Sequence, residues 1–202
     1  PYGETLRDRF WMWGHNPYLM NVINEGLLEK GKRYLEDAEV RPNVEMAEAC
    51  RYMGIPNLYV VMLREYDYAG GLEKYCESLK GLRRIGWGVG DGDTTRTNEE
   101  KKRIGTQAAW MLPNLVNWCC DDFYVGGATS HYSQDELREL RGRARLPGVN
   151  LSVVLYADQG GGITDAVLKE LEMFDTILLW VWKRRESIFW ISVRRRKRFS
   201  IS

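Results

Sequence analysis

The sequence contains few of the residues from which metal and redox centres are built. Its 202 residues include two histidines and four cysteines. The cysteine spacing matches no C-x-x-C pattern, which argues against a zinc or dithiol site. We therefore predict no metal and no cofactor, and we interpret the thiols as buried groups on helices and a strand. The cysteines are Cys50, Cys76, Cys119 and Cys120.

Long apolar runs are also missing. No stretch of about 18 apolar residues occurs, and no basic segment followed by an apolar run opens the chain, so neither a membrane span nor a signal peptide is predicted. The chain begins at Pro1 and not at Met. Localisation therefore stays open, and a secreted or periplasmic protein whose targeting segment lies outside this chain is one alternative.

Charge is distributed unevenly. The net charge is +1, but residues 183–202 contain eight basic residues and one acid, which leaves 21 basic and 27 acidic residues in 1–182. We predict a single domain over 1–182, large enough for one core, followed by an atypical basic tail, 183–202, that is disordered or truncated. Basic blocks can bind nucleic acid through counterion release. Because no basic domain accompanies this block, we do not expect a nucleic-acid partner.

Six segments are predicted to be strands that are buried on both faces of a sheet. Most are short continuous apolar runs, and such runs are typical of strands in a parallel sheet that helices cover. The predicted strands are residues 9–13, 57–63, 84–90, 115–120, 150–156 and 176–182.

Amphipathic helices separate these strands. Residues 44–53, 72–82 and 165–174 carry apolar side chains at helical spacing, and Gly54 is suited to the left-handed cap after the first of them. Thr97 with Glu100, and Ser133 with Glu136, fit the capping box that begins a helix. We interpret Trp110 and Trp118 as packing residues.

The spacing of the units favours a barrel. Strands start at 57, 84, 115, 150 and 176, and a (β/α)₈ barrel averages about 31 residues per unit. A doubly wound sheet has units of similar length, but no G-x-G-x-x-G follows the first strand. We therefore predict an α/β fold, a parallel (β/α) TIM-type barrel that is incomplete at about six units. Either the chain is a fragment or the remaining strands lie outside this sequence.

Polar and aromatic residues recur at the carboxyl ends of the strands. In a parallel barrel these ends meet at one mouth, where active sites lie. The candidates, in strand order, are Trp13, His15 and Asn16; Arg64 and Glu65; Trp87 and Asp91; Asp121, Asp122 and Tyr124; Tyr156, Asp158 and Gln159; and Trp180 and Trp182.

This combination of side chains indicates carbohydrate chemistry. Cleavage of a glycosidic bond needs one protonated and one ionised carboxyl group, and crowding of carboxylates raises the pKa of one of them. Aromatic rings offer flat platforms to the C–H faces of sugars. We predict Asp122 and Asp158 as the catalytic pair, with Glu65 or Asp91 as substitutes, and a carbohydrate ligand.

Among the candidate site residues, the adjacent pair Asp121 and Asp122 gives the clearest local indication of a functional site. Neighbours in a strand face opposite sides, so we expect Asp122 to reach the mouth and Asp121 to be tied to backbone or to a neighbouring loop. The alternative is that both residues only cap the strand end. The glycines of residues 86–92 do not indicate phosphate binding, because no helix start follows them directly.

Three short segments resemble sugar-processing TIM barrels, in particular uncharacterised bacterial barrels similar to glycoside hydrolases. They are Trp13-Gly14-His15-Asn16, residues 53–57 (MGIPN) and Asp121-Asp122-Phe123, and the resemblance spans residues 9–182. It implies a barrel and a hydrolase or carbohydrate-binding activity. Chitinase-like barrels carry D-x-D-x-E on the fourth strand, where this chain has Cys120, Asp122 and Tyr124. That departure removes the family's proton donor.

Three hypotheses follow. The first is a glycoside-hydrolase-like barrel with the carboxylates above, and the second is a non-catalytic glycan-binding barrel, because Tyr124 stands where an acid is expected. The third is a metal-assisted hydrolase with His15, Asp122 and Asp158 around a divalent ion. His15 as an ordinary capped histidine, and Asp158 as a turn residue before three glycines, remain open alternatives.

Overall fold

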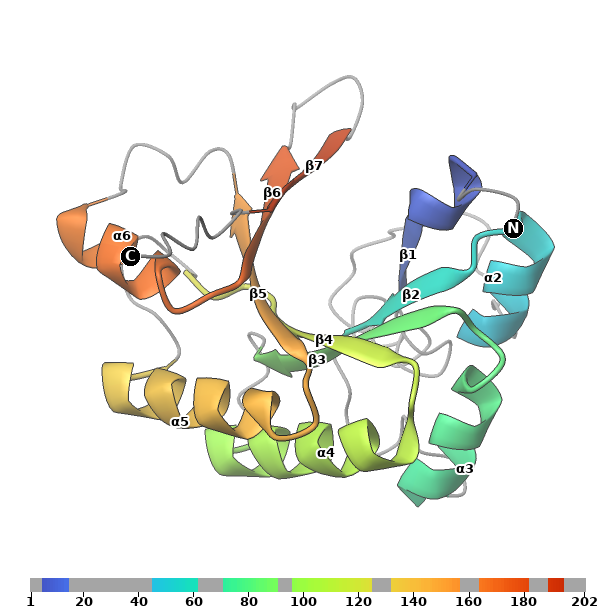
Figure 1. Ribbon diagram of the computed structural model, residues 1–202, viewed down its shortest axis with the longest axis horizontal. Helices are drawn as coiled ribbons and strands as arrows, with labels where there is room; N and C mark the ends of the chain where they lie inside the picture. Colours follow the sequence, from blue (N-terminus) through green and yellow to red (C-terminus); the bar gives the residue numbers. More distant parts are fainter. Residues whose placement is uncertain are drawn as a thin grey trace, which may run out of the picture. The chain divides into compact units, whose positions relative to one another are not determined.

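In the computed structural model the chain alternates strands and helices (Figure 1). The structure describes residues 5–14, 45–61, 71–90, 96–124, 132–156, 164–181 and 189–194. It divides into two compact units, one formed by residues 1–88 and 107–115 and the other by residues 89–106 and 116–202.

The first unit begins with a 3-10 turn and a short strand. Its elements are η1 (Arg7–Arg9), β1 (Trp11–Gly14), α2 (Met46–Met53), β2 (Asn57–Val60), α3 (Gly71–Leu79), most of β3 (Arg84–Gly90) and the end of α4 (Asn98–Met111). β1, β2 and β3 lie side by side in that order and run parallel.

The second unit continues the same pattern. It contains the end of β3, most of α4, and then β4 (Leu115–Cys120), α5 (Gln134–Arg145), β5 (Asn150–Tyr156), α6 (Asp165–Leu171), β6 (Thr176–Val181) and β7 (Phe189–Arg194). β4, β5 and β6 are parallel neighbours. β7 pairs with β6 in the antiparallel direction, so a strand forms within residues 183–202.

The prediction of an α/β fold with six parallel strands is confirmed. The strands of each unit follow the chain order, and the end of β3 lies next to the end of β4, because Asp121 N donates to Gly90 O over 2.6 Å. A doubly wound sheet would reverse its strand order at a switch point. The finer assignment, a TIM-type barrel, stays a prediction.

The predicted element boundaries agree with the structure to within a few residues. β1 starts at Trp11 because Arg9 belongs to η1, whose first turn is held by the bond from Thr5 N to the Asp8 carboxylate. Gly54 takes the predicted left-handed conformation with φ 65°. Ser133 forms the predicted capping box with Glu136 at the start of α5.

Helices pack on one face of the strands in each unit. In the first unit a Cβ on Gly14 would lie 2.6 Å from Met46 Sδ, so this glycine lets α2 approach β1 closely. In the second unit Trp118 of β4 lies fully buried beside Gly105 of α4, which confirms it as a packing residue. Trp110 is 70% exposed, so the prediction that it packs in the core is wrong; it lies on the solvent side of α4.

All four cysteines are buried and free, as predicted, and they lie on α2, α3 and β4. Burial raises the pKa of the Cys50 and Cys76 thiols to about 11, and it also raises that of Cys119. These thiols are therefore protonated at neutral pH and poor nucleophiles.

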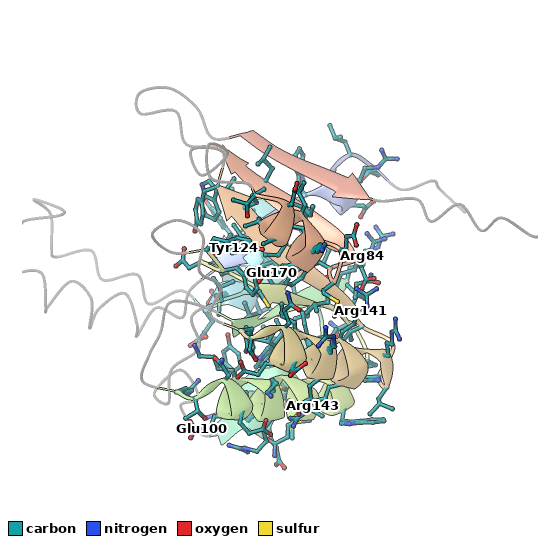
Figure 2. All side chains as sticks on the ribbon, turned by 90° about the vertical axis from the view of Figure 1, so that its left-hand side faces the viewer. Arg84, Glu100, Tyr124, Arg141, Arg143 and Glu170 are labelled. Atoms are coloured by element: carbon teal, nitrogen blue, oxygen red, sulfur yellow. The ribbon has the colours of Figure 1, made fainter. Side chains whose placement is uncertain are left out.

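Charged side chains join α4 and α5 within the second unit. The Lys102 ammonium, whose side chain is 4% exposed, lies 3.0 Å from Glu99 and 2.6 Å from Glu139. Arg143 contacts the same two carboxylates at 2.8 and 2.6 Å, and Figure 2 shows it on α5. Two cations and two anions thus form one network, in which each buried charge has an opposite partner.

None of the helices in the described ranges combines the length and the apolar character that crossing a bilayer requires.

Candidate functional site

Seven of the predicted site residues belong to the part of the chain that the structure describes. They are Trp13, Trp87, Asp121, Asp122, Tyr124, Tyr156 and Trp180. The others lie outside the described residues: His15, Asn16, Arg64, Glu65, Asp91, Asp158, Gln159 and Trp182. The site can therefore be built from the second unit, to which five of the seven belong.

Asp121 follows the last residue of β4 and is held in place by backbone. Its amide donates to Gly90 O at the end of β3, and its Oδ1 accepts from Asp122 N over 2.9 Å. The residue is 5% exposed. Asp121 is thus tied to backbone, as predicted, through its own amide and through its carboxylate.

Asp122 adopts a backbone conformation that is rare for a residue with a side chain. Its φ is 47°, and among the described residues it is the one non-glycine residue with a positive φ. Asp tolerates this region better than most residues, but the conformation still costs free energy. The turn keeps both carboxylates close to Tyr156 instead of placing them on opposite faces.

The hydroxyl of Tyr156, the last residue of β5, bridges the two acids. Tyr156 Oη donates to Asp122 Oδ1 over 2.5 Å and lies 3.4 Å from Asp121 Oδ1. Since both oxygens are within these distances of one atom, they can be at most 5.9 Å apart. Asp122 and Tyr156 are both partly exposed, so this cluster combines a buried acid with groups that solvent can reach.

Trp180 of β6 completes the cluster. It is the Cα partner of Tyr156 in the parallel register, so both side chains stand on the same face of the sheet. The ring centroids are 5.9 Å apart, with the planes tilted by 31°, and Trp180 is also partly exposed. Tyr156 therefore contacts both the acids and Trp180 at the carboxyl ends of neighbouring strands.

The environment keeps the Tyr156 phenol protonated. Burial raises its pKa well above the usual value of 10, and the charge of Asp121 and the hydrogen bond to Asp122 raise it further. A carboxylate beside a phenol disfavours the phenolate. Tyr156 is therefore a hydrogen-bond donor at neutral pH, and the carboxylates are the acceptors.

The Tyr124 side chain points toward α6 and away from this cluster. Its ring is 2% exposed, and its hydroxyl donates to Glu170 Oε2 on α6 over 3.1 Å (Figure 2). The Phe123 ring packs edge-on against it at 4.7 Å. Burial and the Glu170 charge raise the pKa of Tyr124. Tyr124 thus anchors the end of β4 to α6.

The two tryptophans of the first unit have different surroundings. Trp87 is fully buried and meets Tyr75 of α3 edge-on at 6.1 Å, so it faces the helices. Trp13 is partly exposed, and its ring lies 5.2 Å from that of Tyr59, its Cα partner on β2.

The sequence analysis did not identify two aromatic residues that lie close to Trp13, namely Trp11 and Tyr59. Trp11 stands two residues before Trp13, and its ring lies 4.6 Å from Tyr59. The Tyr59 ring packs against Gly86, where an added Cβ would come within 2.2 Å of the ring. The strand period of two could have identified Trp11 from its spacing to Trp13, whereas the position of Tyr59 depends on the register between strands.

No group of three or more His, Cys, Asp or Glu within the described ranges is arranged to hold a metal ion. A hollow of about 330 Å³ is lined by α6 and the first residues of β6, including Leu168, Leu171, Phe174 and Ile177. It lies at the amino end of β6, whereas Trp180 lies at the carboxyl end. None of the predicted site residues lines it.

Comparisons of the chain with models of protein families, with curated proteins and with solved structures find no match. The functional assignment therefore depends on the chemistry of the cluster formed by Asp121, Asp122, Tyr156 and Trp180, which we call the Asp122 cluster.

Proposed function

We propose that the chain is a carbohydrate-active protein of the TIM-barrel type, similar to glycoside hydrolases, and that Asp122 takes part in the hydrolysis of a glycosidic bond. The observation that supports this best is the Asp122 cluster itself. In it a partly exposed carboxylate accepts a hydrogen bond from Tyr156, whose ring in turn contacts the partly exposed Trp180, at the carboxyl ends of parallel neighbours. In β/α barrels, active sites form at these ends.

Each component has a role in sugar chemistry. Trp180 is partly exposed, and in this proposal its indole packs against the C–H groups of a pyranose ring. Asp122 supplies a carboxylate at the edge of the same surface. Cleavage of a glycosidic bond by acid and base catalysis needs such a group next to the anomeric carbon.

A second carboxyl group completes the proposed mechanism. Asp121 is poorly suited to this role, because it is buried and accepts a backbone hydrogen bond. The partner that we propose is Asp158, two residues after the end of β5, with Glu65 and Asp91 as substitutes. These three residues lie outside the described ranges, so their assignment comes from sequence alone.

The alternative is a glycan-binding protein without catalysis. One observation favours it. Tyr124 occupies the position at which chitinase-like barrels carry their acid, and its hydroxyl is directed to Glu170 on α6. A chain that retained the aromatic surface and lacked the proton donor would bind sugar and release no product.

A screen of hydrolysis on plant, microbial and host glycans tests the proposal. The wild type is compared with Asp122→Asn, with Asp158→Asn and with Asp135→Asn, a control whose carboxylate is 91% exposed on α5. We expect activity in the wild type and in the control, with a loss of about 10² to 10⁴ in the first two variants. Equal activity in all four proteins would reject this site. Calorimetric binding without product release would support the glycan-binding alternative.

A further inference from the structure

The hydrogen bonds around Asp122 distinguish between the two possible roles of a catalytic carboxyl group. A proton donor must be a neutral acid, whereas a nucleophile or general base must be ionised. Asp122 Oδ1 accepts a hydrogen bond of 2.5 Å from Tyr156 Oη. A hydrogen bond donated to a carboxylate favours its ionised form, and bonds to ionised acceptors are the short and strong ones.

The direction of this bond follows from the surroundings of Tyr156. Its hydroxyl lies within reach of two carboxylates, Asp121 and Asp122, and burial of the ring adds to their effect in holding the proton on the phenol. Asp121 Oδ1 already accepts from Asp122 N. The phenol proton therefore points to Asp122, the acceptor at the shorter distance.

We propose that Asp122 acts as the nucleophile or general base of the site and that Tyr156 is a positioning residue, which orients the Asp122 carboxylate through the hydrogen bond from its hydroxyl. This inference rests on the proposed glycosidase function and adds the division of roles. It assigns the proton-donating role to a different carboxylic acid. Tyr156, expected from sequence to contact the sugar, acts instead through Asp122.

An oxygen of Asp122 forms a bond to the anomeric carbon, or removes a proton from the water that does so. The glycosidic C–O bond breaks, and its electron pair leaves with the aglycone oxygen. That oxygen takes a proton from the second carboxylic acid. A dinitrophenolate is stable as an anion and leaves without this proton.

Leaving-group dependence therefore tests the role of Asp122. The substrates are pairs of 2,4-dinitrophenyl and methyl glycosides of glucose, galactose, mannose and N-acetylglucosamine, each in both anomeric forms. For the sugar that the wild type hydrolyses, we expect Asp122→Asn to lose on the order of 10³-fold or more in kcat/KM on both members of the pair. If the dinitrophenyl glycoside kept most of its rate while the methyl glycoside lost it, Asp122 would be the acid and the inference would be wrong.

Tyr156→Phe tests the positioning role without removing a carboxylate. We expect kcat to fall about 10-fold with little change in KM, because the ring that faces Trp180 is retained and the donor is lost. Tyr124→Phe is the matched control, because its hydroxyl bonds Glu170 on α6.

The outcomes separate the two claims. A fall in kcat with little change in KM for Tyr156→Phe, with unchanged kinetics for Tyr124→Phe, supports the inference, whereas equal kcat values for all three proteins overturn it. Circular dichroism and the unfolding temperature of each variant show whether the fold is retained. Absence of hydrolysis by the wild type on every glycoside would remove the proposed function and, with it, this inference.

Discussion

Replacement of Asp175 by Ala is expected to destabilise the junction between α5, β5 and β6. Asp175 lies just before β6, and its carboxylate accepts from Leu151 N over 3.0 Å and from Arg141 over 3.3 Å. Leu151 is fully buried. Removal of the carboxylate therefore leaves a buried amide without that acceptor.

The magnitude follows from these two bonds. A buried donor without its acceptor costs about 1–3 kcal/mol, and the ion pair with Arg141, on a partly exposed carboxylate, adds at most about 1 kcal/mol. We expect a total of about 2–3 kcal/mol. In a chain of this size each kcal/mol lowers the unfolding temperature by about 2–4 °C, so Asp175→Ala should lower it by about 4–12 °C.

Thermal unfolding followed by circular dichroism measures this effect. Asp175→Asn keeps a carbonyl oxygen that can accept from Leu151 N, so its loss should be less than half as large. Asp135→Ala removes a carboxylate that is 91% exposed and pairs with Arg138 on the same helix, and it should change the free energy of unfolding by less than about 0.5 kcal/mol. Asp175→Ala with an unfolding temperature within about 1 °C of the wild type would refute the reasoning.

Further predictions concern the core, the thiols and the charge network. Gly86→Ala should destabilise the first unit by about 1–3 kcal/mol, because the added Cβ would come within 2.2 Å of the Tyr59 ring; urea unfolding measures this, and an unchanged midpoint would contradict it. An aromatic disulfide reagent should label none of the four buried cysteines in the folded protein and all four in urea, whereas rapid labelling of the folded protein would contradict their burial. Glu139 has its pKa held below the usual 4.5, chiefly by hydrogen bonds from Lys102 and Arg143, so its contribution to stability is present above about pH 4.5 and is lost as the pH falls through the lowered value. Between pH 6 and pH 3 the unfolding temperature of Glu139→Gln should therefore fall less than that of the wild type, and parallel curves would speak against this linkage.

Local signals were sufficient to predict the elements of the fold. Short apolar runs identify the buried strands, and the residues at helix ends satisfy the first amides or permit a left-handed turn. Ser133 and Gly54 illustrate the two cases. The misplaced start of β1 has a tertiary cause, because Asn57 donates to the carbonyls of Asp8 and Phe10 and so fixes the chain before the strand.

The Asp122 cluster was only partly predictable. The position of Asp121, Asp122 and Tyr156 at the carboxyl ends of parallel strands indicated that they could meet. The bond between Tyr156 and Asp122 depends on the positive φ of Asp122 and on the register of β4 and β5, and neither is encoded in a local pattern. The hydroxyl of Tyr124 bonds to Glu170, a residue 46 positions later in the chain, and no local pattern indicates this contact.

Calorimetric titration of the wild type and of Trp180→Ala with neutral oligosaccharides tests the central claim, that the Asp122 cluster binds carbohydrate, most directly. We predict that the wild type binds at least one of them and that loss of the indole weakens binding by about 10-fold or more, in keeping with the contribution of an aromatic ring at a binding site. Equal affinity of the two proteins for every oligosaccharide bound, or no binding by the wild type, would contradict the account.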